Sequence, residues 1–454
     1  MPKAERALSR NVGLAAIVGL VLIFGAVTEL RSAFLMQRHT DADIYFRAAW
    51  AVQAGQSLYE VTDENGWHYH YPPFLAVLLR PLADPPSGVA GGRLLPYPIS
   101  VALWYGLGAA ALIWAIHGMA RAIEASSRFA ALRRPAFSRP WWVLRLVPSA
   151  VSLVAIGHTL GRGQVGTILL LCVAGMVGSF SAGRGGRAGL WLAGAICLKV
   201  FPAYLLIYPA WRRDWRCLGA CAVGLLLGLA AIPAVVMGPG RTIAAYDDFY
   251  RLVLRGATAN APDASTAEEF YHEREGDLVS FRSVLFKTLH PDPATRPLTL
   301  PGWYDWAQKL LGLGSTLLLL FALGRPELRS TRAIEGPDSV VTTVIVLGLM
   351  LLAVIPLVPV SQPHYYMLVL PLVMGMVADD WQRRGRPRLS FGLGALLSLY
   401  TLATLLAYLP GFERLMDLGL PMHAGLALWV AGLVVLWRRR ALASEMPRAG
   451  EDLD

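Results

Sequence analysis

The sequence predicts an all-α polytopic membrane protein. Hydrophobic residues make up 55% of its 454 residues and charged residues only 16%, which is typical of a chain whose solvent is mostly lipid. Apolar runs of the length of a membrane helix recur from end to end, and charged residues gather between them. We therefore expect about twelve transmembrane helices, with further helices in the loops of the outer face.

The first apolar run, Asn11 to Leu30, contains Glu29 as its only charge. A helix of about twenty residues, rising about 1.5 Å per residue, crosses a hydrocarbon core of about 30 Å. A cleaved signal peptide would have a shorter apolar region followed by small residues. We therefore expect this segment to stay in the protein as its first membrane helix.

The other apolar runs supply the remaining spans. They are 97–118, 146–160, 164–181, 187–199, 201–211, 216–237, 303–323, 339–359, 364–378, 389–409 and 422–437. With both termini in the cytoplasm of a multi-pass cell-membrane protein, more than half of the Lys and Arg residues fall on the inside, as the positive-inside rule requires. The net charge of +10 is then a signal of topology rather than of a nucleic-acid surface.

Two segments allow a second interpretation. Residues 73–82 are apolar enough to span, but crossing there would place a group of arginines outside, so we expect a surface helix. The run 190–211 could be one span, yet Lys199 stands near its middle, where a charge costs roughly 2.5–3.5 kcal/mol. Two half-spans that meet at an outer turn avoid this cost.

We expect one domain, 1–454, with no separate soluble unit. Two outer loops are long, 31–96 and 238–302, and the polar tail 441–454 is expected to be disordered in the cytoplasm. A membrane protein that places its polar residues on one side is expected to work on that side.

The first outer loop carries the acidic pair Asp41 and Asp43 at the start of an expected helix. Its apolar face, which could lie on the membrane, would be formed by Tyr45, Ala48, Ala49 and Val52. Asp41 would point from the N-terminal end into the protein, where a carboxylate can act as a general base toward a hydroxyl. The alternative is that Asp41 only caps the helix.

Three histidines of this loop, His39, His68 and His70, resemble a loose metal set together with the two aspartates. Their spacing matches no compact ligand motif, so we expect no metal and no cofactor, although a metal near these histidines stays open. The stretch 67–73 more readily forms an aromatic wall at the interface.

Basic residues lie at two expected outer turns. Lys199 between the half-spans could pair with a phosphate or reach the headgroups by snorkelling. Arg162, in the turn that ends with Gln164, could serve the same phosphate or simply belong to an interhelical turn. Further on, Arg282 lies in the second loop and His364 opens a later span.

Together these residues resemble glycosyltransferase family 87 of the GT-C superfamily, membrane enzymes that use polyprenyl-phosphate sugars, several of them mannosyltransferases. The resemblance covers nearly the whole chain. It is carried by Asp41-x-Asp43-Ile44-Tyr45, Tyr71-Pro72-Pro73-Phe74, Gly163-Gln164, Leu198-Lys199-x-x-Pro202, Ser280-Phe281-Arg282 and Ser361-x-x-His364.

The resemblance implies a GT-C-like bundle with its active site on the outer face. Asp41 would be the catalytic base, with Asp43 as the other possibility, and transfer would invert the anomeric carbon. Lys199 would hold the donor phosphate together with Arg162 or Arg282. The resemblance also implies that His364 contacts the phosphate or the acceptor. The other substrate-binding residues that it implies are Gln164, Tyr45 and His70.

The implied partners are a polyprenyl-phosphate sugar, a lipid or glycan acceptor and membrane lipids. A hexose, with mannose expected, would be transferred. The alternative from another class is a lipid-linked sugar flippase or other transporter, and a third is a catalytically silent scaffold. The sequence specifies neither sugar, acceptor, polyprenol nor oligomeric state.

Overall fold

A computed structural model describes residues 3–35, 40–89, 94–126, 129, 132, 135–255, 278–297, 301–324 and 339–445. His39, residues 256–277 of the second long loop and the last residues of the tail 441–454 lie outside this set, so the expectations for them are not addressed. Within the described ranges the elements are helical, and the only β pairing is an isolated bridge between Thr62 and His68. The prediction of an all-α protein is confirmed.

The helices of the first half of the chain, including short 3-10 and π segments (η), are α1 (Lys3–Glu29), η1 (Leu30–Leu35), α2 (Asp41–Ala54), α3 (Pro73–Leu78), η2 (Arg80–Leu82), α4 (Tyr97–Ala125), α6 (Arg139–Val151), α7 (Leu153–Gly161), α8 (Gly166–Ser181), α9 (Gly185–Leu198), η3 (Phe201–Leu206), α10 (Ile207–Trp211) and α11 (Trp215–Leu225). Those of the second half are η4 (Leu226–Ala231), α12 (Ile232–Met237), α13 (Pro239–Asp248), η5 (Phe249–Arg255), α15 (Phe281–Leu289), η6 (Pro293–Thr295), α16 (Trp303–Leu323), α17 (Ser339–Val354), η7 (Ile355–Leu357), η8 (Pro363–Val369), α18 (Leu370–Arg384), α19 (Phe391–Ala407), α20 (Glu413–Asp417) and α21 (Leu420–Glu445).

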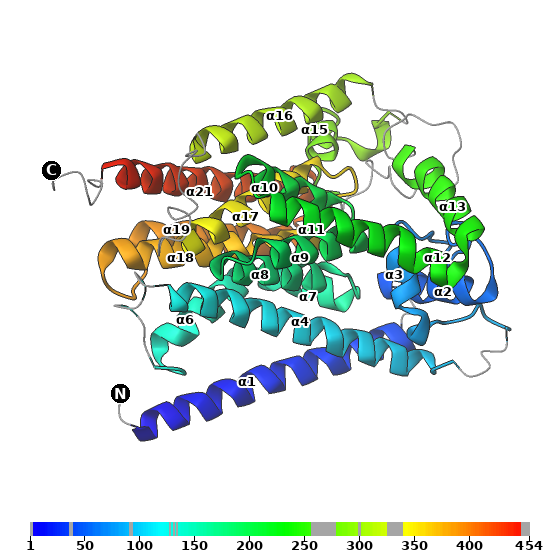
Figure 1. Cartoon of the computed structure of the whole chain (residues 1–454), viewed down its shortest axis with the longest axis horizontal. Coiled ribbons are helices and arrows are strands. Elements are labelled where there is room, and N and C mark those ends of the chain that lie inside the picture. The colour runs from blue at the N-terminus through cyan, green and yellow to red at the C-terminus, as the bar shows by residue number, and fades with distance from the viewer. Residues whose placement is uncertain are drawn as a thin grey trace.

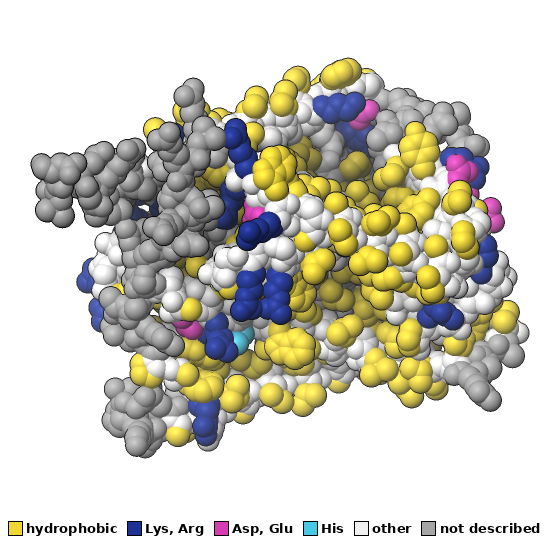
Figure 2. Space-filling view, in the orientation of Figure 1, with side chains coloured by type: hydrophobic (Ala, Val, Ile, Leu, Met, Phe, Trp, Pro, Cys, Tyr) yellow, Lys and Arg dark blue, Asp and Glu magenta, His cyan; other side chains and the backbone are white. Residues whose placement is uncertain are grey.

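Six described segments are long and apolar enough to cross a membrane. The pair of α6 and α7, in which the chain bends by 68°, would add a seventh if the two helices form one span. The six are Ala7–Leu35, Tyr97–Ala125, Trp215–Met237, Trp303–Leu323, Val340–Leu357 and Leu420–Ala441. These spans indicate a multi-pass membrane protein, while the count of about twelve stays a prediction. Figure 2 shows the broad apolar surface between a group of Lys and Arg side chains and the opposite end of the molecule.

The long helices run lengthwise through the molecule (Figure 1). The beginning of α1 and the end of α21 lie at one end, and α2, α3 and α13 gather at the other. Close packing of the bundle relies on small residues. Gly189 of α9 meets the backbone of Cys217 on α11, and Gly348 of α17 meets that of Leu372 on α18, with no space for a side chain at either glycine.

Two local expectations concern breaks in apolar runs. The run that begins at Pro73 forms a short helix, α3, rather than a span-length one, as expected. It is not a surface helix, however, because Pro73, Leu75, Ala76 and Val77 are buried. The chain also breaks at Lys199, because α9 ends at Leu198 and η3 begins at Phe201. Pro202 lacks a backbone N–H, so it favours a new start rather than a continued helix.

The expectation that the apolar face of α2 lies on the membrane is wrong. Tyr45, Ala48, Ala49 and Val52 are all buried inside the protein. They belong to a hydrophobic cluster that also includes Leu75 of α3. Other parts of the protein thus cover this face in place of lipid, and α2 is held as a fixed wall.

Candidate active site

A cavity of about 200 Å³ lies where α2 approaches the turn between α7 and α8, the break after α9, and the segment that joins η7 to η8. Most of the residues predicted from the sequence line it. These are Asp41, Tyr45, His70, Gln164, Lys199 and His364. They come from five separate parts of the chain, so the fold is needed to bring them together.

Asp41 is the first residue of α2, and its half-buried side chain lines the cavity. One carboxylate oxygen, Oδ2, accepts a hydrogen bond and ion pair from Arg162 Nε at 2.7 Å. The positive end of the helix dipole also favours an ionised carboxylate here. The residue that precedes the helix is Thr40, in extended conformation. The alternative that Asp41 is the N-cap is therefore wrong.

Asp43 points away from the cavity. Its buried carboxylate accepts a hydrogen bond from the Tyr97 hydroxyl, and Oδ2 accepts one from the backbone N–H of Thr40 at 3.4 Å. Both contacts stabilise the start of α2 and its attachment to α4. The structure thus places Asp43 in a supporting position, on a different side of α2 from Asp41.

The turn between α7 and α8 positions two polar side chains. Gly163 adopts φ +68°, and an added Cβ would lie 2.7 Å from the Cβ of Ala42 in α2. Only glycine fits both constraints. The Trp104 indole donates to the Gly163 carbonyl at 2.6 Å and fixes the turn. Arg162 is thereby placed beside Asp41, and Gln164 is turned into the cavity.

A hydrogen-bonded group of tyrosines lines the cavity next to Gln164. The Tyr45 hydroxyl donates to the Tyr71 hydroxyl at 2.7 Å, and the Tyr71 hydroxyl lies 3.0 Å from Gln164 Oε1. Lys199 Nζ donates to the same Tyr71 hydroxyl at 3.1 Å. Tyr71 therefore connects the lysine to the wall formed by α2 and the α7–α8 turn.

The Lys199 ammonium stands in the turn after α9 and lies over two rings, 4.3 Å from the ring centre of Tyr365 and 4.9 Å from that of Tyr71. Burial lowers the pKa of Lys199 to about 7, and the nearby Asp41 carboxylate opposes this shift. No carboxylate pairs directly with this ammonium in the described part of the chain. An anion in the cavity would supply that missing partner.

His364 is buried in the cavity wall, and neither ring nitrogen has a hydrogen-bond partner among the described residues. Thr159 holds the His364 backbone instead, through a hydrogen bond from its hydroxyl to the carbonyl at 3.2 Å. Buried polar atoms are seldom left without partners. The imidazole is therefore available to a molecule bound in the cavity.

The structure separates Arg282 from this site. Its buried guanidinium pairs with Asp305, in the first turn of α16, at 2.7 Å.

Arg162 does not line the main cavity, but it lines a smaller neighbouring pocket together with Asp41 and Trp67. Among the residues that the structure describes, no group of His, Cys, Asp and Glu is arranged to hold a metal ion.

Sequence reasoning missed two residues at the centre of the site, Tyr71 and Tyr365. Tyr71 belongs to the stretch 67–73, which the sequence predicted as an aromatic wall at the interface, and Tyr365 directly follows the motif that ends at His364. Apolar side chains also line the cavity beside Lys199, and they include Phe201, Val253 and Val358. A carboxylate, a cation and an apolar wall therefore meet in one space, which suits a ligand with an anionic head and an apolar tail.

One comparison with known proteins agrees with the predicted class. The family model of glycosyltransferase family 87 matches residues 69–291, which confirms the resemblance over that part of the chain. The motifs at Asp41 and His364 lie outside the matched residues. No curated protein sequence matches this chain. Among solved structures, a crystal structure of ArnT from Cupriavidus metallidurans bound to undecaprenyl phosphate is 15% identical, with 95% of this chain and 79% of that chain covered and a TM-score of 0.36.

Replacement Asp43→Ala should lower stability, because a buried acceptor for Tyr97 and Thr40 is lost. We expect a loss of about 1–3 kcal/mol, seen as a lower thermal unfolding midpoint of the detergent-purified protein. The matched control is Asp41→Asn. Its amide oxygen can still accept the hydrogen bond from Arg162, so this variant should unfold close to the native midpoint. An unchanged midpoint for Asp43→Ala would contradict the supporting role.

Proposed function

We propose that this chain, which matches glycosyltransferase family 87 over residues 69–291, transfers a hexose from a polyprenyl-phosphate sugar to a hydroxyl of a lipid or glycan. Mannose is the first sugar to test. The observation that carries the proposal is the shared cavity of the Asp41 carboxylate and the Lys199 ammonium. The first is suited to accept a proton and the second to bind a phosphate.

Asp41 is the proposed general base. Its Oδ2 is held by Arg162, whereas no described residue donates a hydrogen bond to Oδ1. Oδ1 can therefore accept the proton of the acceptor hydroxyl as that oxygen bonds to the anomeric carbon. The bond from this carbon to the phosphate oxygen breaks at the same time, and its electron pair leaves with the polyprenyl phosphate. Attack opposite the leaving group inverts the anomeric carbon.

Lys199 is the proposed phosphate-binding residue. Its ammonium is fixed by Tyr71 and Tyr365, so it needs little rearrangement when charge develops on the leaving phosphate. The apolar side chains beside it, such as Phe201 and Val358, suit the first isoprene units of the donor. A monophosphate leaving group carries a charge that lysine and arginine side chains can balance.

The proposed reaction takes place on the outer face. The loop elements α2 and α3 lie at the end of the bundle opposite the beginning of α1 (Figure 1). If the Lys and Arg residues near the N-terminus keep that end in the cytoplasm, the cavity opens to the outside. A lipid-linked donor would reach it sideways from the outer leaflet.

Asp41→Asn should abolish base catalysis while the donor still binds. We expect transfer from a polyprenyl-phosphate hexose in proteoliposomes to fall about 10²–10⁴-fold, with donor binding near the native level. Glu60→Gln, an exposed change in the same loop, is the matched control and should keep full activity. Normal transfer by Asp41→Asn would exclude this mechanism, and translocation of the lipid-linked sugar without transfer by the native protein would favour a flippase.

The Lys199 pKa of about 7 predicts a pH dependence. The ammonium is present below this pKa and is lost as the pH rises through it, so kcat/KM for the donor should fall above about pH 7. Arginine stays protonated over this range. Lys199→Arg should therefore remove this limb of the pH profile, and an identical limb in the variant would show that another group titrates.

His364→Phe should weaken substrate binding and leave stability unchanged. The imidazole has no protein partner to lose, whereas a lost hydrogen bond to substrate corresponds to an increase in KM of up to about tenfold. Initial rates and the thermal midpoint measure the two effects. Tyr366→Phe is the control in the same η8 segment, since Tyr366 does not line the cavity. An equal rise in KM for both variants would rule out direct contact with His364.

A further inference from the structure

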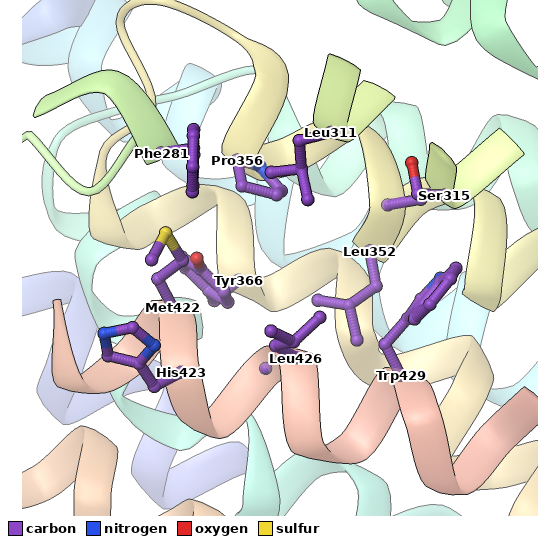
Figure 3. Close-up of a pocket in the computed structure, with 12 residues that line it drawn as sticks. Phe281, Leu311, Ser315, Leu352, Pro356, Tyr366, Met422, His423, Leu426 and Trp429 are labelled. Carbon is purple, nitrogen blue, oxygen red and sulfur yellow. The ribbon is translucent and has the colours of Figure 1, made fainter. Parts of the chain in front are cut away.

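A second pocket, of about 110 Å³, lies between α16, α17 and α21 (Figure 3). Figure 3 shows Leu426 and Trp429 of α21 facing Leu352 of α17 and Leu311 of α16 across it. Its lining is almost entirely apolar and contains no Asp, Glu, Lys or Arg. The hydroxyl of Ser315, one of its few polar groups, donates to the Gly312 carbonyl of its own helix. This chemistry fits hydrocarbon rather than a charged group.

The pocket is separated from the catalytic cavity. The segment from η7 to η8 lies between the two, because Pro356 and Tyr366 line the pocket whereas Val358 and Tyr365 line the cavity. The side chain of Leu357, in the same segment, packs close to Gly312 of α16. A hydrocarbon chain attached to a phosphate at Lys199 would have to cross this wall to reach the pocket.

The pocket is continuous with the surface that faces lipid. All three helices that form it belong to candidate membrane spans. Leu426, which lines the pocket, is 48% exposed, so the pocket reaches the surface at this residue. On the outer side of α16, Leu313 and Leu317 are more than half exposed and would meet the surrounding lipid. Water is a poor occupant, because it needs several polar partners at once, and the lining offers few besides the hydroxyls of Tyr366 and Ser315 and the ring of His423.

We propose that this pocket binds one acyl chain of a bilayer phospholipid. The chain restores the dispersion contacts that an empty apolar space lacks, and its headgroup stays in the outer leaflet near the beginning of α21. This site is independent of the proposed transferase reaction, and its occupant is a different molecule from the donor.

Photolabelling tests the proposal with the full chain. The protein is reconstituted in phosphatidylcholine vesicles with a trace of phosphatidylcholine that carries a diazirine midway along one acyl chain, and labelled residues are mapped by mass spectrometry. We expect strong labelling of Leu352, which is 3% exposed, and background labelling of Leu349, a buried neighbour on α17 outside the pocket.

Two variants sharpen the test. Ser315→Trp fills the pocket from α16 and should reduce Leu352 labelling to background, whereas Leu313→Trp, on the lipid-facing side of the same helix, should leave it unchanged. Background labelling of Leu352 in the native protein would overturn the proposal without any variant. Displacement of the label by added polyprenyl phosphate would also overturn it, because the pocket would then belong to that lipid. Loss of transfer activity alone would bear on the enzyme and not on this site.

Discussion

The close contact between Gly163 and α2 is the constraint on which the candidate active-site cavity depends. A left-handed glycine without a side chain lets the α7–α8 turn lie directly against Ala42. Arg162 and Gln164, on either side of this glycine, can then reach Asp41 and Tyr71 respectively. A larger residue would push the turn from α2 and weaken both contacts. One backbone position thus sets the carboxylate and the tyrosine group relative to each other.

In the cavity, neutral groups hold the Lys199 ammonium, whereas a charged one holds the Asp41 carboxylate. Lys199 is oriented by a tyrosine hydroxyl and two aromatic faces rather than by a direct ion pair, so its charge is left for a ligand. Asp41 pairs with Arg162 through one oxygen only. Because the buried surroundings weaken solvent screening, these fixed charges would act more strongly on the phosphate and hydroxyl of the proposed reaction than they would in water.

Much of this arrangement could be predicted from local sequence. Long apolar runs predict the helices, and Lys199 with the nearby Pro202 predicts the break. The position of Asp41 at a helix start predicts a carboxylate that points inward. The errors concern what surrounds a segment. An apolar face has the same pattern against lipid and against protein, so the burial of Tyr45 within the protein could not be distinguished from contact with a membrane.

Other features depend on partners that are distant in sequence. Asp43 and Asp41 differ by two helical positions, about 200° around the axis, so only the location of Tyr97 decides which of them faces the cavity. The pairing of Arg282 with Asp305 is likewise a tertiary contact. The most direct test of the account is an experimental structure with a non-hydrolysable polyprenyl-phosphate hexose bound. It should place the phosphate within hydrogen-bond distance of Lys199 Nζ and the anomeric carbon toward Asp41; a phosphate bound elsewhere would contradict the account.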